Sequence, residues 1–353
     1  MYLNGIGTAA PPSRYTKLDC WEAFQRSEWF QSLSVRTRAL ARAVLLGENG
    51  MEARRLAVAP LAEGFRIDPE RLHRRFLDAA PELATRAGAA ALDNAGVNAG
   101  DIDALVVSTC TGYLCPGLTG YVIERLGLRP DIAAFDLVGQ GCAAAVPNMR
   151  LGRALIASRS ERSSVLSICV EVSSAAMYLD DDPGVLVSAC LFGDGAGAAV
   201  LSNAPSPGHR RILWQDSESL LDPSQREALM FEQRRGMLRN VLTRPVPRLA
   251  AEYVERVLGT LLRRARLDIS QINGWIVHAG GRDVLLALEE RLGISPQDLR
   301  HSAAVLREYG NLSSAFVYFV LQTALTGGAA GGWWWLGTFG AGFSCHGALL
   351  SVE

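Results

Sequence analysis

The sequence predicts an α/β fold built from two similar halves, and three observations support that prediction. Helical segments alternate with short buried strands along the chain, as expected of a mostly parallel sheet with crossover helices. Three pairs of motifs recur in the same order in the two halves. In addition, 49% of the 353 residues are hydrophobic and 20% are charged, which is enough apolar material for a large core.

The first half supplies alternating elements from residue 78 onward. Strands are predicted where short apolar runs occur, and helices where the composition is helical and a glycine follows. The predicted elements are a helix over 78–96, strands over 104–109, 133–138 and 164–172, and a helix from about Ala144 to Ala157. Pro147 is tolerated near the start of that last helix, because first-turn N–H groups have no intrahelical partner.

The second half repeats the scheme with a helix over 249–267, a strand over 274–281 and a helix over 311–325. Between the halves lies SNAPSPGHRR, whose Pro, Ser and Gly content is typical of a linker. We therefore expect two units, 1–202 and 203–353.

The two halves also match in detail. Aligning DIDALVVSTCTG with DISQINGWIVHAGG on their final glycines sets Thr109 beside His278, and 33 residues then separate Thr109 from Cys142 and His278 from Asn311. Each half closes on a related segment, FGDGAGAAVLS or FGAGFSCHGALLS. Three such matches in one order indicate two copies of a βαβ-rich unit.

This repeat predicts where the chemistry lies. Cys142 and Asn311 occupy equivalent positions, each after a glycine at a predicted helix start, and His278 follows a strand. Because strand ends face the ligand crevice in open α/β sheets, the three side chains should converge. A cysteine at a helix start is favoured as a thiolate, although a small buried core residue is the alternative interpretation of Cys142.

Cysteine, histidine and asparagine together suit acyl transfer. A thiolate attacks thioesters and later leaves again, so Cys142 can hold an acyl group, with His278 favouring its thiolate. Asn311 donates N–H groups but is no base, which indicates stabilisation of an oxyanion together with His278. Without a strong base, enolate formation by loss of carbon dioxide is the reaction that fits.

Other functional classes are disfavoured. A net charge of −1 without a basic patch argues against nucleic acid, and no apolar run approaches a membrane span of about 18 residues. The N-terminus lacks a signal-peptide pattern, which favours a cytoplasmic location. Seven scattered cysteines without C-x-x-C, and five histidines without H-E-x-x-H, predict neither a disulfide framework nor a metal site. DDDPG at 180–184 is interpreted as a solvated loop.

Five segments together resemble a type III polyketide synthase, the chalcone synthase-like branch of the thiolase superfamily. They are QGC at 140–142, LFGDGAGA at 191–198, VHAGGRDVL at 277–285, EYGNLSSA at 308–315 and TFGAGF at 338–343. The resemblance covers the chain from about Arg54 onward. It implies a thiolase-like fold with five α/β/α/β/α layers, a homodimer, acyl-CoA and malonyl-CoA as substrates, and no separate cofactor.

The same resemblance assigns residues to roles. The nucleophile falls on Cys142, and its partners fall on His278 and Asn311. One gatekeeping phenylalanine matches Phe192, whereas the second gatekeeper position is Asn240, where a smaller amide favours a longer or bulkier acyl group than an aromatic starter.

Three further roles are expected beside these. Cys115 is placed near the partner's pocket. Glu171, Cys110 and Ser313 match a hydrogen-bonded relay that assists thioester hydrolysis, in which the thiol is a poor link. A further pair of residues, Arg54 and Arg55, is expected to bind the phosphates of coenzyme A.

The leading hypothesis is an acyltransferase that loads Cys142 from acyl-CoA, extends the chain with malonyl-CoA and releases a cyclised product such as an alkylpyrone or alkylresorcinol. The first alternative is a ketoacyl synthase III-like enzyme that performs a single condensation, with a carrier protein as an acyl source. A Cys-His-Asn amide hydrolase and a non-catalytic acyl-binding subunit are the remaining alternatives.

Overall fold

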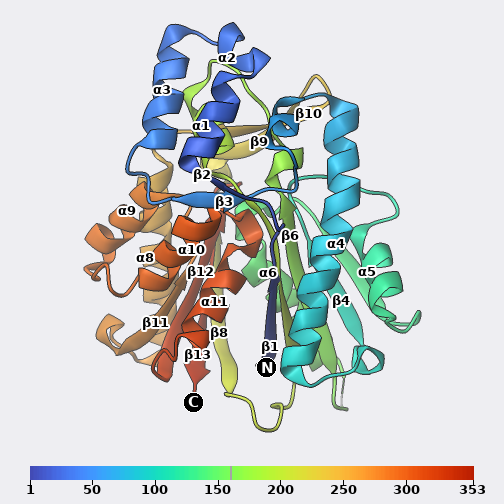
Figure 1. Ribbon diagram of the computed structural model, residues 1–353. Coiled ribbons are helices and arrows are strands. Elements are labelled where there is room, and N and C mark those ends of the chain that lie inside the picture. Colours follow the sequence, from blue (N-terminus) through green and yellow to red (C-terminus); the bar gives the residue numbers. More distant parts are fainter. Residues whose placement is uncertain (160) are drawn as a thin grey trace.

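The computed structural model describes residues 1–159 and 161–353, and its centre is a nine-stranded mixed sheet with the order β11-β12-β13-β8-β1-β7-β6-β4-β5 (Figure 1). The strands of this sheet are β1 (Tyr2–Ala9), β4 (Ala104–Ser108), β5 (Ala133–Leu137), β6 (Ser164–Val172), β7 (Asp194–Ser202), β8 (Ile212–Leu221), β11 (Ile272–Val277), β12 (Gly332–Gly340) and β13 (Ser344–Val352). Two small antiparallel sheets pair β2 (Arg14–Thr16) with β3 (Ala53–Arg55), and β9 (Leu229–Arg234) with β10 (Met237–Leu242).

The large sheet consists of two runs of strands with the same pairing pattern. In the first run β4 is parallel to β6, β6 is antiparallel to β7, and β7 is antiparallel to β1. In the second run β11 is parallel to β12, β12 is antiparallel to β13, and β13 is antiparallel to β8. Between β1 and β8 a single residue pair, Tyr2 with Leu213, joins the two runs. The repeat seen in the sequence is therefore a repeat of strand topology.

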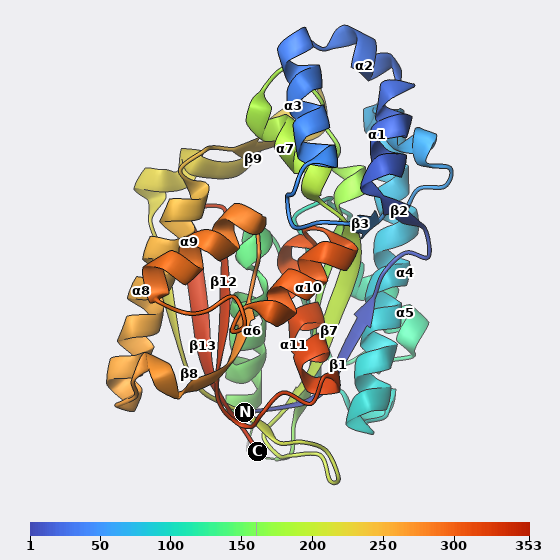
Figure 2. The ribbon, with the colours of Figure 1, turned by 60° about the vertical axis from the view of Figure 1, so that its left-hand side comes forward.

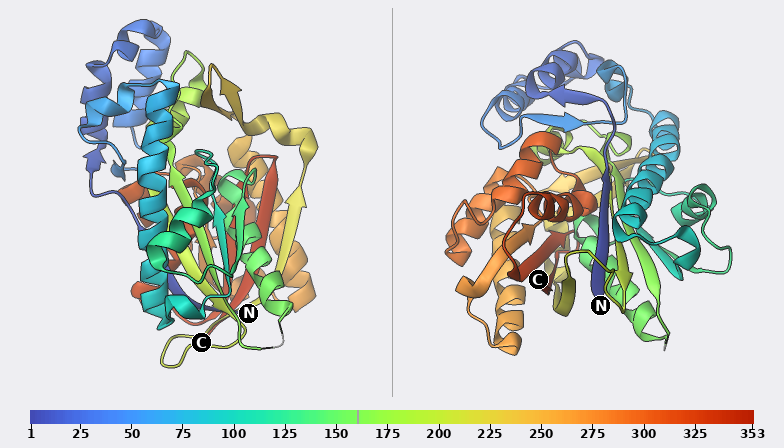
Figure 3. Two further views of the ribbon diagram at one scale, coloured as in Figure 1. Left: turned by 90° about the vertical axis from the view of Figure 1, so that its right-hand side faces the viewer. Right: turned by 60° about the horizontal axis from the view of Figure 1, so that its bottom comes forward.

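The helices complete five layers. They are α1 (Lys17–Gln25), α2 (Glu28–Ser32), α3 (Val35–Leu46), α4 (Pro69–Ala95), α5 (Leu118–Leu126), α6 (Ala145–Ala157), α7 (Pro183–Leu191), α8 (Val246–Ala265), α9 (Arg282–Leu292), α10 (Arg300–Tyr309) and α11 (Phe316–Thr326). Helices α4 and α5 cover the first run of strands and α8 and α9 the second, while α6 and α11 contact both runs (Figures 1 and 3). This arrangement confirms the predicted thiolase-like fold class.

The central helices are anchored by a buried polar network as well as by apolar packing. Ser167 of β6 hydrogen-bonds the Tyr318 hydroxyl of α11 at 2.9 Å and donates to Asn148 of α6 at 2.7 Å. Asn148 in turn donates to the Ile168 carbonyl at 3.0 Å. Because buried polar groups are costly unless paired, these bonds specify how α6 and α11 sit on β6.

Several elements differ from the sequence prediction at their ends. The strand over 164–172 is β6 as predicted, whereas the helix predicted from 78 begins at Pro69, where the Asp68 side chain caps it. The helix predicted from 311 begins only at Phe316, because 313–315 form a 3-10 turn. In α6, Pro147 is the third residue, where its missing N–H costs no helical bond.

A cap that the sequence analysis did not predict covers one end of the sheet. Helices α1–α3, together with α7 and the β9–β10 hairpin, lie at the opposite end of the molecule from both chain termini (Figures 1 and 2). None of the helices in 1–159 and 161–353 has the length and apolar character needed to cross a membrane.

Candidate active site

One cavity of about 690 Å³ brings together the three residues predicted to carry the chemistry. Cys142, His278 and Asn311 all line it, and their exposed fractions are only 6%, 1% and 4%. Phe192 and Asn240 line the same cavity. The convergence expected from the sequence repeat is therefore observed.

Glycines allow the backbone to approach Cys142 closely. The cysteine lies in a 3-10 turn, Gly141–Ala143, that leads into α6, and Gly141 has a φ of 55°. A Cβ at Gly340, at the end of β12, would lie 2.6 Å from the Ala143 nitrogen and 3.0 Å from the Cys142 nitrogen. The turn after β12 thus packs against the backbone of the nucleophile, which no larger residue would permit.

Burial keeps Cys142 protonated in the resting structure. Desolvation raises the pKa of its thiol to about 12, although a hydrogen bond from the Ser313 hydroxyl at 3.0 Å opposes that shift and the nearby Glu171 carboxyl adds to it. The thiol must lose its proton when a thioester binds, so groups that stabilise the thiolate control the reaction rate.

His278 is equally desolvated. Its ring lies 5.3 Å from that of Phe316 and 5.0 Å from that of Phe339, and burial lowers its pKa to about 3. Within the described residues its Nδ1 atom has no hydrogen-bond partner, and no hydrogen bond links its ring to Cys142. The imidazole is therefore neutral at rest. Its predicted pairing with the Cys142 thiol requires a geometry that forms with substrate, as catalytic hydrogen bonds often do.

The Asn311 amide is fixed with one donor free. Its Oδ1 accepts the Ser313 N–H at 2.8 Å, and its Nδ2 donates to the Gly280 carbonyl at 3.0 Å. Its backbone forms an isolated β-bridge with Phe192. Since an amide nitrogen carries two protons, the second N–H is left for the cavity, where it can stabilise an oxyanion.

Ser313 connects the nucleophile to a buried acid. It has a φ of 51°, and its hydroxyl lies 3.0 Å from the Cys142 sulfur, 3.4 Å from the Cys110 sulfur and 3.4 Å from Glu171 Oε1. Positive φ is unfavourable for serine, and such strain concentrates at functional sites. A hydroxyl has one proton, so Ser313 donates to either Cys142 or Glu171 at any moment.

Glu171 is fully buried and extensively hydrogen-bonded. Its carboxyl group accepts the Cys110 N–H at 3.0 Å, the Thr111 hydroxyl at 2.9 Å and the Ser314 hydroxyl. Burial raises its pKa even though these bonds oppose the shift. The Cys110 sulfur lies 3.3 Å from the same carboxyl group, so the predicted contacts of the relay are present, together with a direct link from Ser313 to Glu171.

Arg54 does not bind coenzyme A in the way the resemblance implied. It is only 4% exposed, and its guanidinium donates to the carbonyls of Ala189 at 2.6 Å and Phe192 at 3.0 Å. Arg55 instead pairs with Glu308 at 3.3 Å and does not line the cavity. The expectation is therefore corrected. The buried Arg54 guanidinium supports the end of α7 and the segment carrying Phe192, and Arg55 lies outside the cavity.

Other arginines, which the sequence analysis missed, reach the cavity. Arg36, Arg244 and Arg282 are exposed and line it, which places a cationic rim on its solvent side. Arg282 could have been found from the sequence, because it follows His278 directly after Ala-Gly-Gly. Cys115 is exposed and does not line this cavity.

The loop at 180–184 is also more than a solvated segment. Asp180 and Asp182 both pair with Arg239 of β10, and Asp182 caps α7. Across 1–159 and 161–353, no group of three or more histidine, cysteine or acidic residues has the arrangement of a metal site.

Comparison with known proteins decides the family. Residues 15–213 match the family described as FAE1/Type III polyketide synthase-like protein, and residues 219–351 match the C-terminal domain of chalcone and stilbene synthases. The chain belongs to the type III polyketide synthase family. It is therefore an acyltransferase of the malonyl-CoA-using class. The family membership predicted from the five sequence segments is confirmed.

Relatives of this polyketide synthase agree in sequence and fold. A 3,5-dihydroxyphenylacetyl-CoA synthase of Amycolatopsis balhimycina is 31% identical over 319 residues, covering 89% of this chain and 82% of the relative. The structure of PKS-I from the brown alga Ectocarpus siliculosus matches with a TM-score of 0.90 at 24% identity, covering 99% of this chain and 98% of that one. The structure of the 1,3,6,8-tetrahydroxynaphthalene synthase of Streptomyces coelicolor A3(2) matches with a TM-score of 0.89 at 25% identity, covering 100% of this chain and 99% of that one.

Replacing Ser313 by alanine should raise the pKa of the Cys142 thiol, because a donor to the thiolate is lost. The pH profile of Cys142 alkylation by iodoacetamide should move upward by about one pH unit, with a rate about tenfold lower at neutral pH. An unshifted profile would show that Ser313 does not support the thiolate.

Asn311 and His278 should divide the labour of this polyketide synthase. In Asn311→Ala, malonyl-CoA decarboxylation should slow by about a hundredfold, the size of one lost oxyanion donor, while acyl loading suffers much less. In His278→Ala both steps should be impaired, because the imidazole also receives the thiol proton. Release of radiolabelled carbon dioxide measures decarboxylation, and intact-protein mass measures acyl loading. An equal loss of loading in both variants would contradict this division.

Proposed function

We propose that this enzyme transfers an acyl group from acyl-CoA to Cys142, extends it with malonyl-CoA and releases a cyclised polyketide such as an alkylpyrone or alkylresorcinol. The observation that carries the proposal is the single cavity that unites Cys142, His278 and Asn311. Much of its lining is apolar, including Val187 and Leu191 of α7, and an acyl chain would be accommodated there.

The proposed reaction uses Cys142, His278 and Asn311 in successive steps. Cys142 passes its thiol proton to His278, and the resulting thiolate attacks the thioester carbonyl. The coenzyme A thiolate leaves and takes that proton from His278. Malonyl-CoA then loses carbon dioxide, and the free N–H of Asn311 and the His278 ring stabilise the enolate oxygen. The enolate carbon attacks the acyl-cysteine carbonyl, which returns the Cys142 thiolate and leaves a chain two carbons longer on coenzyme A.

The cationic rim supports coenzyme A thioesters as substrates. Arg36 and Arg244 have no acidic partner among the ion pairs of the described residues, and Arg282 lies 3.7 Å from an exposed carboxylate of Glu48. Exposed guanidinium groups at a cavity rim suit phosphate binding. We assign the phosphate contacts to these three arginines, and a carrier protein that delivers the starter in the cytoplasm would present its phosphopantetheine by the same route.

A homodimer is part of the proposal. Strand β5 is an edge of the large sheet, and three large apolar side chains near it are unusually exposed: Phe135 at 41%, Val138 at 58% and Tyr113 at 72%. An edge strand with exposed apolar groups is suited to pairing with a second copy. Cys115 follows Tyr113 closely, which supports its predicted place near the partner.

Product release is proposed to favour a lactone. A relay that hydrolyses the thioester would run from Glu171 through Cys110, whose thiol is a weak donor and acceptor, or directly to Ser313 over a long contact of 3.4 Å. Both routes activate water weakly, so attack by the chain's own enol oxygen is favoured, giving an α-pyrone.

A second candidate is the activity named for the Amycolatopsis relative, 3,5-dihydroxyphenylacetyl-CoA synthesis. The 31% identity over 319 residues favours it, and the amide at position 240 gives the cavity a polar wall. Product masses from malonyl-CoA alone, compared with malonyl-CoA plus acyl-CoAs of increasing length, separate the two candidates and also reveal a single condensation.

Cys142→Ala should abolish covalent loading. Intact-protein mass spectrometry with acyl-CoA should show one acyl adduct on the native protein and none on this variant. Cys190→Ala is the matched control, because Cys190 is also buried with its pKa raised to about 12 yet does not line the cavity. An adduct that persists on Cys142→Ala would remove the central step.

Asn240→Phe should shift starter preference toward shorter acyl chains, because the larger ring overfills the cavity. The ratio of kcat/KM for hexanoyl-CoA to that for dodecanoyl-CoA should rise by about tenfold, the scale at which apolar pockets discriminate by size. Asn240→Leu separates size from polarity, since it keeps the volume and removes the amide. An unchanged ratio in Asn240→Phe would show that residue 240 does not bound the acyl site.

A further inference from the structure

The β9–β10 hairpin has little intrinsic means of holding its position. It is a two-stranded sheet separate from the large one, closed by Arg235 and Gly236 with φ values of 54° and 75°. Two consecutive residues of positive φ form the tight turn typical of such hairpins. Isolated two-stranded hairpins are marginally stable, so the place of this one depends on what anchors it.

Cavities adjoin the hairpin on both sides. On one side, the hairpin residues Leu229, Asn240 and Leu242 contribute to the lining of the active-site cavity. On the other side is a second cavity of about 750 Å³ that reaches Cys110, and the hairpin contributes to its lining through Met230, Phe231, Gln233, Met237 and Leu238. The hairpin therefore separates two spaces, and its apolar packing includes Leu229 in the hydrophobic core, with Leu242 packed against that core.

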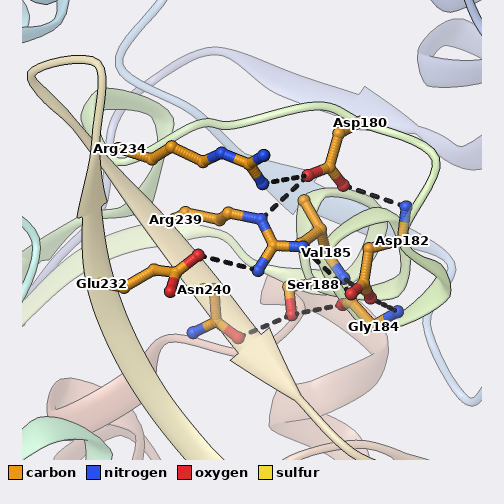
Figure 4. Close-up of polar contacts among 9 residues, drawn as sticks. All are labelled: Asp180, Asp182, Gly184, Val185, Ser188, Glu232, Arg234, Arg239 and Asn240. Atoms are coloured by element: carbon orange, nitrogen blue, oxygen red, sulfur yellow. Dashed lines mark hydrogen bonds and ion pairs between the residues drawn. The ribbon is translucent and has the colours of Figure 1, made fainter.

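One buried guanidinium provides the anchor (Figure 4). The Arg239 side chain is 9% exposed, and each of its nitrogens contacts a different carboxylate: Nε to Asp180 at 2.8 Å, Nη2 to Asp182 at 3.0 Å and Nη1 to Glu232 at 3.1 Å. Glu232 lies directly across the hairpin from Arg239. The planar fork of arginine suits three simultaneous partners, which the point charge of lysine does not.

The same contacts reach the helix that forms the opposite wall. Asp182 accepts the N–H groups of Gly184 at 2.8 Å and Val185 at 3.4 Å, so the carboxylate paired with Arg239 also caps α7. One turn further along, the Ser188 hydroxyl lies 2.9 Å from Asn240 Oδ1 (Figure 4). The hairpin and α7 are thus joined by one ion cluster and one hydrogen bond, besides the close approach of Gly184 to the Leu242 carbonyl.

We propose that Arg239 is a positioning residue for starter selection, which holds the hairpin carrying Asn240 against α7 and so keeps the two cavities apart. Its neutral replacement leaves three carboxylates close together, with Arg234 at 3.7 Å from Asp180 as the nearest remaining cation. Repulsion then opens the partition, and longer acyl chains gain access. The inference rests on the proposed acyl-CoA starter, but its geometry does not involve the catalytic residues.

The test compares native enzyme with Arg239→Met, Arg239→Lys and Asp180→Asn. The kcat/KM ratio of dodecanoyl-CoA to hexanoyl-CoA should rise about tenfold in Arg239→Met, and less in the other two. Malonyl-CoA decarboxylation should stay within about twofold, because Cys142, His278 and Asn311 are untouched. The matched control is Arg264→Met, which removes an arginine that pairs with Asp216 and Glu218 away from the cavity.

Each outcome is decisive. An unchanged kcat/KM ratio in all three variants would overturn the inference, because Arg239 would then not affect starter selection. A loss of decarboxylation parallel to the loss of loading would also overturn it, because that result indicates a general structural role. Alkylation of Cys142 by N-alkylmaleimides of two chain lengths repeats the comparison without coenzyme A. If native enzyme loads no acyl-CoA, the proposed function fails, while the maleimide ratio still tests Arg239.

Discussion

The burial of α6 and α11 between the two runs of strands is the constraint on which the site depends. Cys142 lies in the turn that leads into α6, and Asn311 lies two residues before the turn that leads into α11. Fixing the two helices therefore fixes the proposed nucleophile and the proposed oxyanion donor together. The hydrogen bonds of Ser167 to both central helices make this arrangement specific, because apolar packing alone would tolerate small shifts. The duplicated topology therefore has a chemical result: equivalent turns from two halves meet.

The same burial explains the electrostatics of the residues proposed to be catalytic. Desolvation favours the neutral forms of both side chains, so it raises the pKa of Cys142 and lowers the pKa of His278. Forming a thiolate from the neutral thiol therefore needs a group that stabilises the charge. The Ser313 hydroxyl lies beside the sulfur, and its strained backbone indicates that the fold accepts a local cost to keep it there.

How far the sequence predicts this molecule depends on whether a feature is local or distributed. Strand β6 and the Cys142, His278 and Asn311 set were predictable, because apolar runs and a repeated spacing mark them. The CoA role of Arg54 was wrong, since a motif does not reveal that a guanidinium is buried against helix carbonyls. Nothing local in the sequence joins Arg239 to Asp180, because the pairing exists only once the hairpin packs beside α7.

The residues proposed for the reaction and those proposed for substrate selection lie in different parts of the fold. The groups proposed to react lie at the start of the central helices or at the end of β11, where packing density and buried hydrogen bonds leave little freedom. The wall that would measure the acyl chain comes from α7 and the β9–β10 hairpin, and the ion pairs of Arg239 join the hairpin to the start of that helix. Ion pairs of this kind depend on a few side chains and are sensitive to substitution of any one of them. A fold organised in this way can change the substrate it accepts by altering residues in the cap while the chemistry in the central layer stays constant.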